Sequence, residues 1–319
     1  MLVFYPETHW QHAPQLQFFA GKLVAHPETP ARIELLLAAC QRLNLQIRAV
    51  NTEVPAEILS KIHSPSYIRY LSSTCLGIPL GQETLTISKH IDSYTPLNRF
   101  TYQAASHSAN TALLAAEAVL SGESTTYALC RPPGHHAERA AAAGFCYFNN
   151  AALVAETLSE RGKVAILDID YHHGNGTQHA FYDRADVLYV SLHADPVHEF
   201  PRSSGFRNER GTQAGLGFTH NYPLPKNIDS KQYLRVLREA LEVVNSYAPN
   251  FVVLSLGFDT FKDDPIGGFN LAESIYGAIG DLVATKLPYP TVIIQEGGYN
   301  LNKLGVLGQK FFTGYCQKH

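Results

Sequence analysis

The sequence predicts a single α/β domain in which helices flank an open, mostly parallel β-sheet. Short apolar runs alternate along the chain with longer segments whose apolar residues recur every three or four positions. The short runs are apolar throughout, which is typical of parallel strands buried between two helix layers. The chain has 319 residues, 45% of them hydrophobic, and it contains no linker rich in Pro, Gly or Ser. We therefore expect one domain over residues 1–319.

Six apolar runs are expected as strands because each is short and is bounded by polar or turn-forming residues. In chain order they are residues 2–5, 126–130, 164–167, 187–192, 251–256 and 291–295. Five segments are expected as helices because their apolar residues would share one face of a helix. They are residues 31–43, 102–120, 150–161, 231–247 and 273–286. Strands that alternate with helices in this way form parallel sheets.

Charge, hydropathy and cysteine content exclude several classes of protein. The 25 basic and 28 acidic residues form no long run of either sign, so we expect no nucleic-acid partner. No apolar stretch approaches the roughly 20 residues of a membrane span. The N-terminus also lacks the features of a signal peptide, so we expect no membrane contact. The five cysteines form no CxxC pair, which argues against disulfides and predicts a cytoplasmic protein.

Polar residues follow several of the expected strands, at the point where each strand ends. Residues 131–136 read RPPGHH, residues 168–173 read DIDYHH, residues 193–196 read HADP, residues 257–259 read GFD and residues 296–299 read EGGY. Ligands of open α/β sheets bind beyond the carboxyl ends of the strands. We therefore expect these side chains to form one site.

Asp170, His172 and Asp259 are the expected metal ligands. Asp170 and His172 are two residues apart at a strand end, where alternate side chains share a face, and Asp259 ends a later strand. Two carboxylates and one imidazole leave a coordination position open, as a catalytic metal requires. Zn²⁺ is the first choice, and Fe²⁺ or Co²⁺ also suits these ligands.

His135, His136 and Tyr299 are the expected acid–base and oxyanion-binding groups. Histidine titrates near neutrality, so two adjacent imidazoles can act as base and acid when different partners separate their pKa values. Asp168 and Asn175 are the nearby candidates for these partners. Tyr299 follows two glycines, which would let its hydroxyl point at a developing oxyanion.

Together these motifs resemble the histone deacetylase superfamily, whose metal hydrolases have an arginase-like α/β fold. The similar segments are RPPGHHA at 131–137, GFCYFNN at 144–150, residues 168–178, and EGGY at 296–299. The resemblance implies a Zn²⁺-dependent amide hydrolysis in which Asp170, His172 and Asp259 bind the metal. It also implies that Asp168 orients His135 and that Asn175 lies beside His136, which is the base. Tyr299 would polarise the acetyl carbonyl. Asn175 replaces the carboxylate of vertebrate class I enzymes and resembles class II and bacterial members.

Within the superfamily, the chain looks most like bacterial acetylpolyamine amidohydrolases, which hydrolyse acetylputrescine, acetylcadaverine and related amides. The segments that carry this resemblance are SLHADP at 191–196, NYP at 221–223 and SLGFDTFKDDPI at 255–266. The resemblance implies that Asp92, Gly144 and Phe145 contact the substrate, and that structural K⁺ binds near Asp168, Ser191 and Leu192. The simpler interpretation of Glu83 is a solvated loop carboxylate, and attraction of a distal ammonium of the substrate is the alternative.

One departure bears on the substrate and on assembly. The bacterial polyamine enzymes carry a long insertion before the first long helix, which forms a dimer and narrows the active-site channel. The corresponding stretch here, about residues 73–99, is much shorter. A monomer and a homodimer therefore both stay open, and so does the choice between acetylated polyamine and acetyl-lysine as substrate.

Three other functions are compatible with parts of this sequence pattern. A protein lysine deacetylase would share every catalytic residue. An arginase-like ureohydrolase with two Mn²⁺ would need a further Asp where this chain has Gly257. A non-catalytic acyl-binding protein is disfavoured by the intact His135, His136 and Tyr299. The prediction is a deacetylase of acetylpolyamines, with a lysine deacetylase as the alternative.

Overall fold

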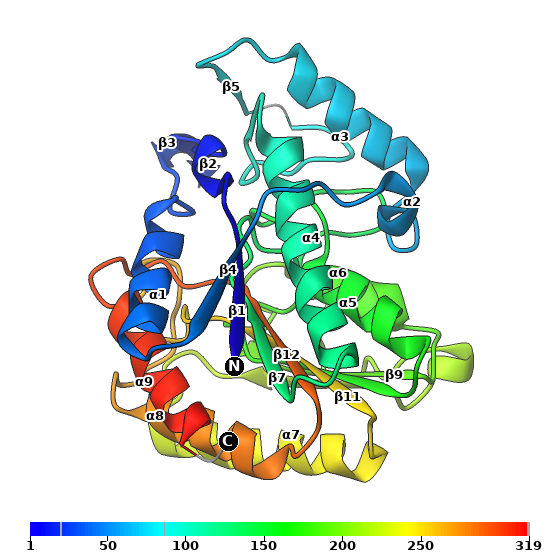
Figure 1. Cartoon of the computed structure of the whole chain (residues 1–319), viewed down its shortest axis with the longest axis vertical. Coiled ribbons are helices and arrows are strands. Elements are labelled where there is room, and N and C mark those ends of the chain that lie inside the picture. Colours follow the sequence, from blue (N-terminus) through cyan, green and yellow to red (C-terminus); the bar gives the residue numbers. More distant parts are fainter. Residues whose placement is uncertain (20, 86, 318–319) are drawn as a thin grey trace.

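The computed structural model describes residues 1–19, 21–85 and 87–317. Its centre is an eight-stranded sheet in which every described pair of neighbouring strands is parallel (Figure 1). From one edge to the other the strands are β10 (Thr219–Leu224), β9 (Val187–Ala194), β8 (Val164–Asp168), β11 (Phe251–Leu256), β12 (Thr291–Gln295), β7 (Thr125–Ala128), β1 (Leu2–Pro6) and β4 (Gln46–Val50).

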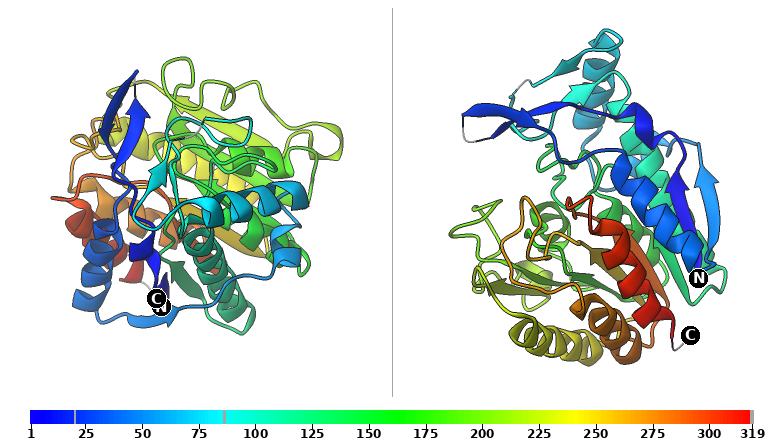
Figure 2. Two further views of the ribbon diagram at one scale, coloured as in Figure 1. Left: turned by 90° about the horizontal axis from the view of Figure 1, so that it is seen from above. Right: turned by 90° about the vertical axis from the view of Figure 1, so that its left-hand side faces the viewer.

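Helices cover both faces of this sheet (Figures 1 and 2). One layer contains α1 (Ala31–Arg42), α7 (Ser230–Tyr247), α8 (Ile275–Lys286) and α9 (Leu304–Cys316). The opposite layer contains α4 (Thr101–Leu120), α5 (Asn150–Ser159) and α6 (Asn175–Phe181), with α3 (Pro65–Gly77) and α2 (Ala56–Leu59) beyond them. Each layer has its own apolar core against the sheet. None of the helices that the structure describes has the length and apolar character to cross a bilayer.

Smaller elements lie outside the main sheet. Two short antiparallel ladders join β2 (Leu16–Phe19) to β3 (Lys22–Ala25) and β5 (Glu83–Thr84) to β6 (Leu97–Asn98). Single 3-10 turns are formed at His9–Gln11 and at Gln213–Gly215. Strands β2 and β3 lie beyond the C-terminal end of β1 (Figure 1).

The six predicted strands and five predicted helices are confirmed, each to within two residues at either end. The strands could be predicted from their apolar runs, because a strand that is buried on both faces contains few polar residues. Strands β8, β9 and β12 are buried along their whole length. The predicted open parallel sheet flanked by helices, in a single domain, is therefore the fold of the chain.

The elements that sequence reasoning missed include both edge strands of the main sheet, the glycine-containing helix α9, helices α2, α3 and α6, and the two small ladders. The edge strand β4 is largely exposed, and the other edge strand, β10, contains Pro223, which only an edge strand tolerates well. Helix α9 contains three glycines, which lower helix propensity. These glycines permit close packing: a Cβ at Gly314 would lie 2.0 Å from the carbonyl oxygen of Gly277 on α8.

Candidate active site

The predicted site residues meet at the carboxyl edge of the parallel sheet. Asp168 ends β8, and Asp170 and His172 follow it. Asp259 lies just beyond β11, and Tyr299 just beyond β12. His135 and His136 lie in the loop between β7 and α5. The topology therefore brings together segments that are far apart in the sequence.

Asp170, His172 and Asp259 form a compact group whose ligand atoms all lie within 4.8 Å of one another. His172 Nδ1 lies 3.1 Å from Asp259 Oδ2 and 3.5 Å from Asp170 Oδ1. Ligands of a tetrahedral zinc ion, bound at about 2.1 Å, are about 3.4 Å apart. The spacing therefore fits one metal ion held by all three side chains.

The charges in this group also fit a cation. Both carboxylates are buried, and burial together with the neighbouring Asp170 raises the pKa of Asp259 to about 7. Two ionised carboxylates in an apolar interior repel one another, and a divalent cation between them removes that cost. The donor set thus favours a bound divalent metal.

Two glycines make room for these carboxylates. A Cβ at Gly257 would lie 2.2 Å from Asp170 Oδ2, and a Cβ at Gly297 would lie 2.4 Å from Asp259 Oδ2 and 2.6 Å from Asp170 Oδ2. The backbone N–H of Gly297 also donates to Asp170 Oδ2 at 2.7 Å. Glycine is therefore required at both positions for space next to the metal ligands.

The tandem histidines have different partners. His135 Nδ1 lies 3.1 Å from Asp168 Oδ2, while His136 Nδ1 lies 2.8 Å from Asn175 Oδ1. The two rings are only 4.0 Å apart between centroids. The structure thus brings together both pairs that the resemblance implied.

The different partners separate the pKa values of the two histidines. Burial lowers the pKa of His135, but the carboxylates of Asp170, Asp168 and Glu296 outweigh burial and raise this pKa to about 10. Burial and the positive charge of His135 hold the pKa of His136 well below 6.5. At neutral pH one imidazole is therefore charged and the other neutral, as an acid and a base require.

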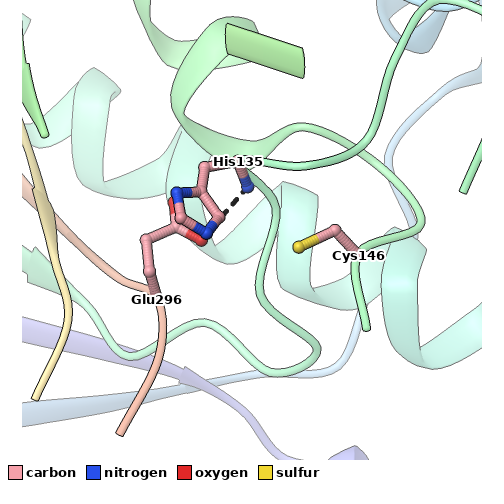
Figure 3. A group of neighbouring side chains, drawn as sticks. All are labelled: His135, Cys146 and Glu296. Atoms are coloured by element: carbon pink, nitrogen blue, oxygen red, sulfur yellow. Dashed lines mark hydrogen bonds between the residues drawn. The ribbon is translucent and has the colours of Figure 1, made fainter. Parts of the chain in front are cut away.

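Glu296 anchors the turn that carries the tandem histidines. Its Oε2 accepts the backbone N–H of Gly134 at 2.8 Å. It also accepts the backbone N–H of His135 at 3.2 Å (Figure 3). With His135 and Cys146 it forms a second group whose spacing could suit a metal. Burial raises the pKa of the Cys146 thiol well above 9. The contacts that Glu296 makes are with the backbone of the histidine-bearing turn, which they hold in place.

Neighbouring residues hold Tyr299 in the wall of the cavity described below. Asp264 Oδ2 accepts the backbone N–H groups of Tyr299 at 2.7 Å and Asn300 at 3.1 Å, and the Arg32 guanidinium lies 4.7 Å from the Tyr299 ring centroid. Burial raises the pKa of the Tyr299 hydroxyl well above 10. The hydroxyl therefore stays protonated and can donate a hydrogen bond.

A cavity of about 750 Å³ opens onto these groups. His135, His136, His172 and Tyr299 line it, as do the predicted substrate-contact residues Gly144 and Phe145. Phe145 packs edge-on to Tyr299, and Phe200, to which sequence reasoning assigned no role, packs edge-on to His136. The two phenylalanines thus present aromatic walls beside the proposed reacting groups.

Asp92 and Glu83, the other two predicted substrate contacts, both bind groups of the chain itself and are not among the cavity-lining residues. Asp92 accepts hydrogen bonds from the backbone N–H of Gly144 at 2.9 Å and from the hydroxyl of Thr95 at 2.6 Å. Glu83 accepts the backbone N–H groups of Gln15 and Leu16. Asp92 therefore holds the Gly144 loop, and Glu83 holds the start of β2; both carboxylates are used by the protein itself.

The segments expected to bind K⁺ lie side by side in the sheet. Asp168 of β8 is the register partner of Ser191 of β9, and both are buried together with Leu192. The Ser191 hydroxyl lies 2.7 Å from His193 Nδ1. His173, which had no assigned role, lies 3.1 Å from Gln178 Oε1 and stacks against His193 in the same interior region.

Comparison with known proteins identifies the family of the chain. The family model for the histone deacetylase domain matches residues 26–314. The chain is 37% identical to an acetylpolyamine amidohydrolase of Burkholderia pseudomallei over 99% of this chain and 98% of that protein. It is 34% identical to acetylpolyamine amidohydrolase 2 of Pseudomonas aeruginosa over the whole of both chains.

A solved structure shows the same architecture. The crystal structure of the acetylpolyamine aminohydrolase from Burkholderia pseudomallei superimposes with a TM-score of 0.94 at 36% identity, covering 99% of each chain. The family model spans most of the chain, and the similarity to the curated relatives extends over nearly all of it. The chain therefore belongs to the histone deacetylase family and is a deacetylase of the hydrolase class.

Proposed function

We propose that this protein is a zinc-dependent amidohydrolase that removes acetyl groups from acetylated polyamines of the acetylputrescine or acetylcadaverine type. One observation carries the proposal. A buried Asp–His–Asp ligand set, a neutral imidazole, a charged imidazole and a protonated phenol converge on a single cavity. This combination is what metal-assisted amide hydrolysis requires.

Asp170, His172 and Asp259 are proposed to hold the metal. Zn²⁺ is the preferred ion, and Fe²⁺ or Co²⁺ would suit the same donors. The bound ion would lower the pKa of a water molecule and polarise the acetyl carbonyl. We also assign a structural K⁺ to the neighbourhood of Asp168, Ser191 and Leu192, where β8 and β9 are paired.

His136 is proposed as the general base. Its Nδ1 faces Asn175 Oδ1, so Nδ1 carries a proton and Nε2 has a free lone pair. This nitrogen belongs to a ring that lines the cavity, so it can take a proton from the attacking water.

His135 and Tyr299 are proposed to assist the later part of the reaction. His135 stays protonated beside Asp168 and can deliver a proton to the amine as the carbon–nitrogen bond breaks. Tyr299 donates its hydroxyl hydrogen to the carbonyl oxygen as negative charge develops there. Both groups lie in the cavity wall, within reach of one bound acetamide.

Acetylated polyamines are the preferred substrate class for two reasons. The relatives that match the full length of the chain are named acetylpolyamine amidohydrolases. The aromatic walls formed by Phe145 and Phe200 suit a thin methylene chain next to the reacting amide.

Acetyl-lysine on a protein is the second candidate, and the charges around the cavity favour it. Apart from histidines, the charged lining residues are Arg202, Lys226 and Glu199. Glu199 is the single carboxylate among them and pairs with Lys226 at 3.3 Å. This lining offers little attraction to a substrate with several ammonium groups.

The test is a comparison of kcat/KM for acetylputrescine with kcat/KM for an acetyl-lysine peptide, using zinc-loaded enzyme. We expect acetylputrescine to be preferred by at least about tenfold, which corresponds to about 1.4 kcal/mol of transition-state binding. A preference for the peptide would replace the proposed substrate class with the second candidate. Absence of acetate release from either substrate would contradict the proposed reaction.

A further inference from the structure

A chain of hydrogen-bonded side chains leads from His136 to the protein surface. Asn175 Oδ1 lies 2.8 Å from His136 Nδ1, and Asn175 Nδ2 donates to Glu138 Oε1 at 2.7 Å. Glu138 Oε1 in turn lies 3.2 Å from His179 Nδ1. The first two members are buried, whereas the side chains of Glu138 and His179 are 38% and 47% exposed.

Glu138 is the closer of two acceptors that orient the Asn175 amide; the second is the backbone carbonyl oxygen of His136, to which Asn175 Nδ2 donates at 3.5 Å. An asparagine side chain can present either its oxygen or its NH₂ group to a neighbour, and the neighbours determine the choice. An ionised carboxylate only accepts hydrogen bonds, so Glu138 must face the NH₂ group of Asn175. The amide oxygen of Asn175 is then left facing His136, as the structure shows.

The Asn175 orientation in turn fixes the tautomer of His136. The amide oxygen accepts a hydrogen bond and cannot donate one, so the ring nitrogen that faces it, Nδ1, must carry the proton. A neutral imidazole has one N–H, which leaves Nε2 unprotonated. If the amide were reversed, its NH₂ group would need an unprotonated Nδ1, and Nε2 would carry the proton instead.

We propose that Glu138 is a positioning residue that, through Asn175, holds His136 in the tautomer whose Nε2 can accept a proton. The inference rests on the proposed function, in which His136 is the base. A carboxylate acting through an intermediate group to orient a histidine is a familiar device near metal sites. Here the intermediate group is a neutral amide, so the carboxylate selects the tautomer and keeps its negative charge away from the imidazole.

His179 supports the same arrangement from the solvent side. It contacts the oxygen of Glu138 that accepts from Asn175. The hydrogen bond from His179 is the main reason that the pKa of Glu138 is lowered. Glu138 therefore stays ionised, and so remains an acceptor only, over the neutral pH range.

The proposal can be tested by exchanging the hydrogen-bond donor and acceptor at positions 138 and 175. In Glu138→Lys the side chain at 138 becomes a donor only, which favours the reversed amide and the wrong tautomer of His136. In Glu138→Lys with Asn175→Asp, the new carboxylate accepts from both the lysine and His136 Nδ1, so the correct tautomer returns. Glu117→Lys, a change of equal charge at an exposed position of α4, is the matched control.

We expect kcat of the zinc-loaded Glu138→Lys enzyme to fall about 10- to 100-fold, with little change in KM. The double variant should exceed Glu138→Lys in kcat, while Glu117→Lys should match the unaltered enzyme. Thermal unfolding of each variant identifies any loss of folding. A folded Glu138→Lys enzyme with the kcat of the control, or a double variant no faster than Glu138→Lys, would overturn the proposal.

Nitrogen-15 NMR of histidine-labelled, zinc-loaded enzyme reads the tautomer without reference to activity. His136 is assigned by the signal that His136→Ala removes. The proposal requires a protonated Nδ1 and an unprotonated Nε2 in the unaltered enzyme, and loss of that pattern in Glu138→Lys. A protonated Nε2 in the unaltered enzyme would overturn it. The expected NMR pattern in an enzyme with no deacetylase activity would support the tautomer control by Glu138 and contradict the proposed function instead.

Discussion

Tyr299 has the only phenol among the groups proposed to act on the substrate, and its hydroxyl is held protonated by burial. Tyr299→Phe removes one hydrogen-bond donor to the developing oxyanion and leaves the ring in place. We expect kcat to fall about 100-fold or more, equivalent to about 3 kcal/mol, with a smaller change in KM. Steady-state kinetics on acetylputrescine measures this.

Tyr70→Phe is the matched control for that change. It removes a phenol hydroxyl that contacts Ser88 outside the residues lining the cavity. If Tyr299→Phe turned over substrate as fast as Tyr70→Phe, the oxyanion role would be wrong.

At the scale of single residues, sequence reasoning succeeded where the chemistry of a side chain depends on its place at a strand end. Asp170, His172 and Asp259 could be grouped because parallel strands end at one edge. The contacts of Asp92 and Glu83 could not be predicted, because a carboxylate in a loop looks the same in sequence whether it meets a ligand or a backbone N–H group. Glu138 was missed although it lies two residues after His136, because its partner Asn175 is distant in the sequence.

The turn after β12 is the element that brings the metal ligands close together. Gly297→Ala would place a Cβ 2.4 Å from Asp259 Oδ2 and 2.6 Å from Asp170 Oδ2, so both carboxylates must shift. We expect the zinc content per chain to fall, and kcat/KM to fall at least about tenfold. Metal analysis after dialysis, together with kinetics, checks this.

Gly277→Ala is the control for the turn. The nearest atom to a Cβ at Gly277 would be 3.5 Å away, and this residue lies within helix α8, where alanine is favoured. This variant should keep its zinc and its activity. Full zinc retention in Gly297→Ala would show that the turn does not constrain the metal ligands.

At the scale of elements, the predictability of a strand follows its burial. Strands β8, β11 and β12 in the middle of the sheet are continuous apolar runs and could be predicted from sequence. Strands β4 and β10 are edges, where polar residues are tolerated, and their register with β1 and β9 is set by tertiary contacts. Helix α9 forms against α8 despite its glycines, because close packing outweighs weak propensity.

A buried charge network joins distant parts of the whole molecule. Glu28 Oε1 lies 2.7 Å from the guanidinium of Arg32 and 2.9 Å from that of Arg131. Arg32 also donates to the carbonyl oxygen of Gly298 at 2.7 Å, in the turn that carries Tyr299. The network therefore connects the segment before α1, the end of β7 and the active-site turn.

The network predicts how stability depends on pH. Burial raises the pKa of Glu28, but Arg131 and Arg32 outweigh burial and lower this pKa from 4.5 to about 2. The unfolded chain therefore takes up a proton at Glu28 before the folded chain does. Glu28 contributes stability above pH 4.5, on the order of 3 kcal/mol, and this is lost as pH falls toward 2.

Denaturant unfolding at several pH values tests that dependence. Between pH 4.5 and 2, the free energy of unfolding should fall less steeply with decreasing pH in Glu28→Gln than in the unaltered enzyme. The difference between the two slopes should correspond to the uptake of about one proton on unfolding. The variant should also be less stable at neutral pH, by about 3–5 kcal/mol, because two buried guanidinium groups lose their partner. Equal slopes for Glu28→Gln and the unaltered enzyme would contradict the role assigned to Glu28.

The central claim is that one divalent ion, held by Asp170, His172 and Asp259, is required for deacetylation. The most direct measurement is acetate release from acetylputrescine as chelator-stripped enzyme is titrated with Zn²⁺. We expect almost no release without metal, recovery that saturates at about one ion per chain, and no recovery by Asp259→Asn over the same range. Full activity in the stripped enzyme, or normal recovery by Asp259→Asn, would contradict the claim.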